Sequence, residues 1–192
     1  MVSAIGRQCA HYSPDMVKPC RIGAINCCNC QCFSTREANY IRRGMPNTVV
    51  IFAGTNDIVS GANPETIVAN TKTITNIART QGAKVLVTSS IARNFNEAQE
   101  LTRQNVRELI AADSSWYDGY CDLSSDPLIG IEGTQTNSTY FHNDQTHLTQ
   151  LGQTVLARLL MQDIENLTRL QVSIYGLQVG TMSNSRKIGI GI

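Results

Sequence analysis

Short apolar runs separated by amphipathic segments limit what this chain can fold into. Residues 48–53 (TVVIFA) and 84–89 (KVLVTS) are rich in β-branched and other apolar side chains, as are strands buried on both faces. The segment between them has apolar residues at helical spacing, begins at an N-cap and first-turn pair, Asn63 and Pro64, and stops at Gly82. Strands that alternate with helices predict an α/β fold with three layers, α/β/α, and a parallel sheet.

The rest of the chain continues this alternation. The sequence predicts strands at 21–26 and 116–122 and helices at 34–43, 95–112 and 148–167. Residues 1–12 predict a short helix, and apolar residues alternate with polar ones from Leu170 to Gly180 as in a strand. We therefore expect one domain over residues 1–167 and a C-terminal tail over 168–192 that is strand-like or disordered.

Composition excludes several classes of protein. Of the 192 residues 42% are apolar and 16% charged, with a formal net charge of +1, which argues against a disordered chain and against nucleic-acid binding. No run reaches the roughly 20 apolar residues of a membrane-spanning helix. Charged or titratable residues interrupt the first 20 residues, where a signal peptide would be apolar: Arg7, His11, Asp15 and Lys18. The compartment and the oligomeric state stay undetermined.

Two polar segments follow predicted strands or loops at what would be the carboxyl edge of the sheet, where α/β proteins gather their reactive groups. Residues 54–57 (GTND) place Asn56 after a glycine turn, so that its amide could donate to a developing oxyanion; an ordinary turn is the alternative. Asp144 and His147 are three residues apart, so the carboxylate could hold one imidazole nitrogen and leave the other as a general base. The alternative is a solvated pair at a helix start.

Taken together, VVIFAGTNDI and DQTHLTQLG resemble the motifs of the SGNH, or GDSL-type, hydrolases, and the resemblance runs from about Arg21 to about Asp163. It implies a flavodoxin-like α/β/α fold and hydrolysis of a carboxylic ester of an acetylated carbohydrate, a lipid or an aryl alcohol through an acyl-enzyme. It also implies that Asn56 is an oxyanion donor, His147 the base and Asp144 its orienter. This chemistry needs no metal and no nucleotide cofactor.

The chain departs from that family in two places. The family's nucleophile lies in a Gly-Asp-Ser block after its first strand, and no Gly-Asp-Ser occurs here. The chain therefore resembles a family member that begins one element late and lacks its first strand. In the second glycine block, Cys28 stands where the family has the glycine whose backbone amide completes the oxyanion hole, and its Cβ would crowd a turn that needs positive φ.

The missing first strand has a structural consequence. The strands at 21–26 and 48–53 would either expose unpaired edges or pair directly with each other. Part of the tail, Leu170 to Val179 or Lys187 to Ile192, could pack on the sheet or pair with another copy of the chain and partly cover such a gap; an irregular tail is the alternative.

Six of the seven cysteines lie in the first 32 residues, four of them between Cys27 and Cys32. Zinc binding and a redox pair are alternatives to unpaired cysteines, but the thiols crowd one turn, unlike a structural zinc site. A cysteine nucleophile paired with His147 is a further alternative. Among the serines, Ser34 fits an N-cap, and Ser89 and Ser90 fit a turn, so no nucleophile is identified.

Two functions follow from these observations. The first is a serine-esterase-type hydrolase domain that is impaired because its serine block is absent. The second is a noncatalytic, truncated or decayed esterase domain that serves as a binding or structural module. If the motifs are interpreted correctly, His147 lies within hydrogen-bond reach of Asp144, and Asn56 faces the same cleft.

Overall fold

The computed structural model describes residues 2–5, 22–27 and 47–174, with side chains from 47 to 167. Its five strands form one parallel sheet in the order β1-β2-β3-β4-β5: β1 (Val2–Ile5), β2 (Ile22–Cys27), β3 (Thr48–Ala53), β4 (Lys84–Thr88) and β5 (Gly119–Cys121). The helices described are α2 (Thr55–Val59), α3 (Pro64–Thr80), α4 (Glu97–Ala112) and α5 (Gln150–Ile174). Short 3-10 turns lie at η2 (Leu123–Ser125) and η3 (Thr134–Thr136).

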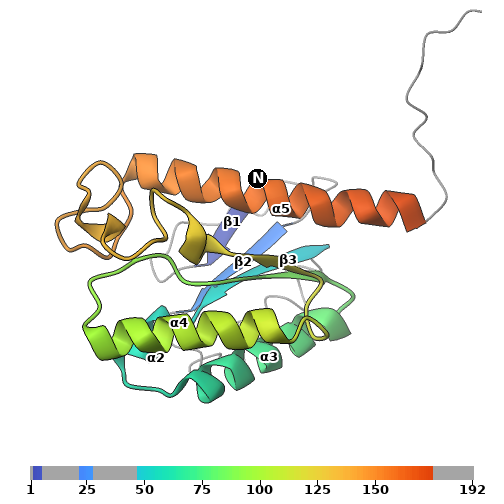
Figure 1. Ribbon diagram of the computed structural model, residues 1–192. Helices are drawn as coiled ribbons and strands as arrows, with labels where there is room; N and C mark the ends of the chain where they lie inside the picture. Colours follow the sequence, from blue (N-terminus) through green and yellow to red (C-terminus); the bar gives the residue numbers. More distant parts are fainter. Residues whose placement is uncertain (1, 6–21, 28–46, 175–192) are drawn as a thin grey trace, which may run out of the picture.

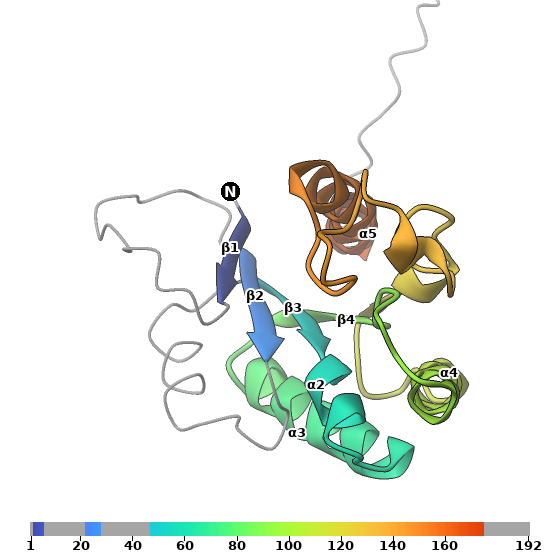
Figure 2. The same ribbon diagram turned by 90° about the vertical axis from the view of Figure 1, so that its left-hand side faces the viewer.

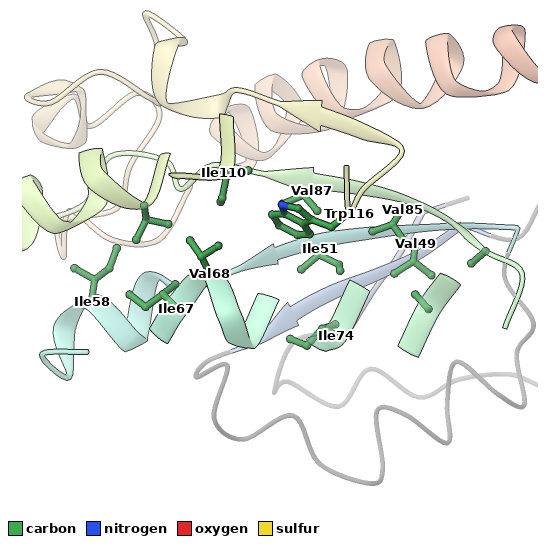
Figure 3. Close-up of a cluster of buried hydrophobic side chains, with 13 residues drawn as sticks. Val49, Ile51, Ile58, Ile67, Val68, Ile74, Val85, Val87, Ile110 and Trp116 are labelled. Atoms are coloured by element: carbon green, nitrogen blue, oxygen red, sulfur yellow. The ribbon is translucent and has the colours of Figure 1, made fainter. Parts of the chain in front are cut away.

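The sheet lies between two helical layers, with α5 on one face and α3 and α4 on the other (Figures 1 and 2). Successive side chains of a strand point to opposite faces, so β3 and β4 supply both cores. Val49, Ile51, Val85 and Val87 pack in the cluster that includes residues of α3 and α4 (Figure 3), whereas Val50 and Leu86 pack in the cluster that includes residues of α5. Complete burial of one such side chain stabilises the fold by about 1.5–3 kcal/mol. The predicted three-layer parallel α/β fold is confirmed.

Asparagine caps precede the two long helices on the α3–α4 face, and the sequence predicted the one at Asn63. The side chain of Asn63 accepts a hydrogen bond from the backbone N–H of Thr66 at 2.8 Å, and Pro64 occupies the first turn of α3. At α4, Asn96 and Gln99 form a reciprocal capping box with bonds of 2.9 and 3.0 Å. These caps satisfy N–H groups that the first helical turn cannot pair internally.

The strand order fits a sheet without its first strand. A flavodoxin-like sheet has the order 2-1-3-4-5, which places its first strand between the second and third. Here β2 pairs directly with β3, in a register that sets Ala24 beside Val50 and Ile25 beside Ile51. Of the two outcomes expected for these strands, exposed edges or direct pairing, the structure shows direct pairing.

Two predicted elements are wrong. Residues 2–5 form the edge strand β1, parallel to β2, instead of the start of a helix, because the run VSAI is too short for its periodicity to distinguish strand from helix. The last helix begins at Gln150 and continues to Ile174, so the boundary after Leu167 falls within α5 and the strand-like interpretation fails over 170–174.

Other expectations lie outside the described residues. These are the rest of the predicted N-terminal helix, the helix at 34–43 with its cap Ser34, most of the cysteine cluster and the chain beyond Ile174. Within the described ranges, no helix is both long and apolar enough to cross a membrane.

Candidate active site

Asp144 and His147 are joined in a tight polar turn. The carboxylate of Asp144 lies 2.5 Å from Nδ1 of His147 and also accepts the backbone N–H groups of Thr146 and His147, each at 3.0 Å. These bonds lower the pKa of Asp144 well below its ordinary value, and the bond from the His147 side chain is the largest cause. The His147 side chain is 76% exposed, so its other ring nitrogen is accessible from solvent.

The turn precedes α5 as a small hairpin. An antiparallel bridge joins Phe141 to Leu148, and within it the N–H of His142 donates to the carbonyl of His147 at 2.8 Å. His147 therefore lies ahead of the helix, which starts three residues later. Gly152 permits this packing: a Cβ at that position would lie 2.2 Å from the carbonyl oxygen of Tyr140.

Asn56 stands at the carboxyl end of β3, in the first turn of α2. The strand leads into this helix through Gly54, whose φ of 100° is left-handed and where a Cβ would crowd the side chain of Ile67. Ser60 binds the Asn56 carbonyl twice, through its backbone N–H at 3.0 Å and its hydroxyl at 2.8 Å. The segment predicted as a turn is thus a short helix that fixes the backbone of Asn56.

Arg93, which sequence reasoning missed, connects the two halves of the site. Its Nη1 donates to Oδ1 of Asn56 at 2.5 Å and reaches Oγ1 of Thr55 at 3.4 Å. The N–H of the next residue, Asn94, donates to the carbonyl of Gln145 at 2.9 Å, inside the Asp144–His147 turn. Partial burial lowers the pKa of Arg93, and the charge of Asp144 opposes that shift. Asn56 and the Asp144–His147 turn therefore lie at the same edge of the sheet, joined through residues 93 and 94.

The serines that follow β4 have structural partners. Ser89, 2% exposed, donates to Asp122 at 3.0 Å and accepts the N–H of Ser124 at 2.8 Å. The carbonyl of Ser90 accepts hydrogen bonds from Arg103 and from the Ser124 hydroxyl. The structure thus agrees with their interpretation as structural residues, while Cys28 lies outside the described residues.

The metal interpretation of the cysteine cluster concerns mostly undescribed residues. In the described ranges, no three His, Cys, Asp or Glu side chains come together as metal ligands could. Cys121 is buried in the core on the α5 side, where desolvation raises the pKa of its thiol.

Comparisons with known proteins bear on the family and the fold of this chain. The family model of the GDSL-like Lipase/Acylhydrolase family matches residues 34–155. Among solved structures, a carbohydrate esterase family 3 protein from Talaromyces cellulolyticus matches 70% of this chain at 16% identity with a TM-score of 0.52. An acetyl esterase mutant with acetate ion matches 73% of the chain at 18% identity with a TM-score of 0.49. A search of functionally curated proteins found no match.

The chain covers only part of the length of each of these solved structures. This chain spans 66% of the acetyl esterase chain and 65% of the Talaromyces chain. At 16% identity, the likeness to the Talaromyces protein shows a shared fold. The family match covers well over half of the chain and includes the segment with Asn56 and the turn with Asp144 and His147. The chain belongs to the GDSL-like lipase/acylhydrolase family.

Proposed function

We propose that this chain carries the base and oxyanion halves of an ester-hydrolase site. His147 is the general base, Asp144 orients it, and Asn56 donates to the oxyanion. The observation that carries the proposal is the 2.5 Å contact between Asp144 and Nδ1 of His147, which leaves the second ring nitrogen free to act as a base. The substrate class is a carboxylic ester of a carbohydrate, a lipid or an aryl alcohol, in line with the family and with the Talaromyces esterase that shares the fold.

No nucleophile is identified for this site among the residues whose side chains are described. The chain contains no Gly-Asp-Ser, and in the part of the chain whose side chains are described no serine or cysteine is hydrogen-bonded to the imidazole of His147. A base and an oxyanion hole without a nucleophile keep only a small part of the catalysis of a full triad. We therefore expect this chain to hydrolyse p-nitrophenyl acetate no faster than His147→Ala does.

An external nucleophile can test the base and the oxyanion donor independently. Methanol is small, and it needs general-base assistance to attack an ester at neutral pH. With p-nitrophenyl acetate and methanol, we expect methyl acetate to form faster with the chain than with His147→Ala or Asn56→Ala. Loss of one oxyanion donor typically lowers such a rate about 10²–10³-fold. His142→Ala, which removes an exposed histidine from the same hairpin, is the control.

Each outcome separates the alternatives. Methanolysis that depends on His147 and Asn56 supports the proposal. Equal methanolysis by the chain and by both variants contradicts it. Hydrolysis without methanol that falls on His147→Ala would contradict the expected impairment. Because a general base also activates water, a nucleophile within the chain would be shown only by an acetyl group left on it.

A second function has one observation in its favour. Direct pairing of β2 with β3 closes the position where a flavodoxin-like sheet has its first strand. A domain closed in this way fits the noncatalytic alternative, a binding or structural module. Equal methanolysis by the chain and its variants would favour that function.

A further inference from the structure

Arg93 occupies a position that the proposed chemistry leaves unassigned. It follows β4 at the carboxyl edge of the sheet, and its guanidinium donates to the side-chain oxygen of Asn56 at 2.5 Å. Its neighbours anchor it on both sides: the N–H of Ala92 donates to the carbonyl of Ile129, and that of Asn94 donates to the carbonyl of Gln145, each at 2.9 Å. The guanidinium carbon also lies 5.9 Å from the centre of the Phe95 ring.

The chemistry of the two side chains fixes the orientation of the Asn56 amide. A guanidinium has five N–H donors and no acceptor, whereas a carboxamide has one acceptor oxygen and one NH₂ group. Only the oxygen of Asn56 can therefore face Arg93. The NH₂ group is left as the part of Asn56 that can serve an incoming oxygen. In the opposite orientation, the NH₂ group would face a cation and the amide oxygen would repel a developing oxyanion.

The segment that carries Arg93 also relates the oxyanion donor to the base. Asn94 is hydrogen-bonded to Gln145, and Gln145 lies between Asp144 and His147 in the turn. Gln145 has a positive φ of 52°, an uncommon conformation for a residue other than glycine. The segment that carries Arg93 thus contacts both halves of the site.

We propose that Arg93 is the positioning residue of the oxyanion hole: it holds the Asn56 amide with its NH₂ group toward the substrate oxygen. This inference rests on the proposed function for its catalytic consequence, but the orientation of Asn56 can be measured without any turnover. Arg93 acts through Asn56 and takes no part in proton transfer.

The first test is the NMR signal of the Asn56 side-chain NH₂ group in the full chain. In the wild type, a fixed amide gives two separate proton signals at positions distinct from those of free carboxamides. Arg93→Met removes every donor but keeps the apolar stem, so the two signals should shift toward those of a free carboxamide. Arg93→Lys keeps one cationic donor and should restore part of the shift.

Arg79→Met is the matched control. Arg79 is a partly exposed arginine near the amino end of β4, where its Nη1 donates to the carbonyl of Ser115 at 3.3 Å. Arg79→Met removes a partly exposed guanidinium at the opposite edge of the sheet. It should leave the Asn56 signals unchanged. Unchanged Asn56 signals in Arg93→Met, with a folded backbone spectrum, would overturn the proposal.

The second test follows methanolysis of p-nitrophenyl acetate. Arg93→Met should lower kcat about 10- to 100-fold with little change in KM, because the oxyanion contact forms fully only in the transition state. Arg93→Lys should recover part of this loss, and an unchanged kcat in Arg93→Met would contradict the catalytic role. If the wild type shows no His147-dependent methanolysis, the proposed function fails, and the NMR experiment still decides whether Arg93 orients Asn56.

Discussion

At the residue scale, the Asp144 carboxylate is held by its own turn. Three donors converge on it: the backbone N–H groups of Thr146 and His147 and Nδ1 of His147. One side chain thereby fixes both the shape of the turn and the orientation of the imidazole. A carboxylate so engaged stays ionised at any pH where a histidine titrates, because hydrogen bonds to the charged form lower its pKa.

His147→Ala should raise the pKa of Asp144, since the His147 side chain is the largest cause of its depression. The two backbone hydrogen bonds remain, so the pKa should stay below its ordinary value. Because the folded pKa is lowered, the stability that this carboxylate contributes is present above its unfolded pKa and is lost as pH falls through the folded value. A ¹³C NMR titration of the Asp144 carboxyl measures this shift, with His142→Ala as control; an identical titration in both variants would contradict the assignment.

Gly54→Ala should be costly at the start of α2. A left-handed φ costs an L-residue roughly 1–2 kcal/mol, and here the new Cβ would also lie 2.9 Å from Cγ2 of Ile67. Gly61→Ala is the control, because its φ of 79° is also left-handed but a Cβ added there would have no atom within 4 Å. Urea denaturation should show a larger loss for Gly54→Ala, by about 1 kcal/mol or more. Equal losses of unfolding free energy in the two variants would show that the contact with Ile67 does not contribute to the destabilisation.

The contrast between Asp144 and Arg93 shows which site residues a sequence can reveal. Asp144 and His147 lie three residues apart, so local geometry alone brings their side chains together. Arg93 and Asn56 are 37 residues apart, and they meet only because the segments that follow β3 and β4 converge. A single arginine after a strand has no spacing pattern to mark it, so its role depends on tertiary packing that the sequence does not display.

At the element scale, the start of α3 was predictable from its cap, whereas the end of α5 was not. Asn63 and Asn96 mark the starts of α3 and α4, because their side chains satisfy the first N–H groups of each helix. The end of α5 was missed: the tract at 170–174 alternates like a strand, but Leu167, Leu170 and Ile174 are also three and four residues apart. Extending an existing helix adds one hydrogen bond per residue without a new nucleation step, which favours the helix.

Hydrogen bonds from Arg103 join α4 to the loops that follow β4 and β5. It is 5% exposed and pairs with Glu100, and its Nη1 donates to the carbonyls of Ser90 and Gly130 and to the hydroxyl of Ser124 at 3.0–3.1 Å. Each nitrogen of the guanidinium thus has a partner in or beside the α4 layer. Arg103 therefore links α4 to the loops that contain Ser90 and Ser124.

Arg103→Met should lower the free energy of unfolding by about 3–5 kcal/mol, because it leaves Glu100 buried without its counter-charge. Arg107→Met is the matched control on the same helix. Its ion pair with Asp122 is partly exposed, at 42% and 28% of the two side chains, and such a pair contributes about 0.2–1 kcal/mol. Urea midpoints at constant m-value compare the two variants. A loss in Arg103→Met no larger than in Arg107→Met would contradict a stabilising buried pair.

At the scale of the whole molecule, the direct pairing of β2 with β3 leaves no position for another strand between them. Six residue pairs from Ile22↔Thr48 to Cys27↔Ala53 bring the backbones together over the full length of both strands. The sheet then continues outward through β1, so Val2–Ile5 lies at the edge of the sheet and not at its centre. The parallel architecture was predictable from the apolar runs. The strand order was not, because it depends on which strands pair in the folded chain.

Cross-strand NMR contacts test that order. Neighbouring strands lie about 4.8 Å apart, and two strands separated by a third lie about twice as far. We therefore expect backbone NOEs between the Ala24–Ile25 and Val50–Ile51 segments in the full chain, as the register requires. The contacts between β3 and β4, such as Val49 with Val85, serve as the internal control. If the control NOEs are present and those between β2 and β3 are missing, β2 does not lie beside β3. The central position would then be open to a nucleophile-bearing strand, and the noncatalytic alternative would lose the observation that favours it.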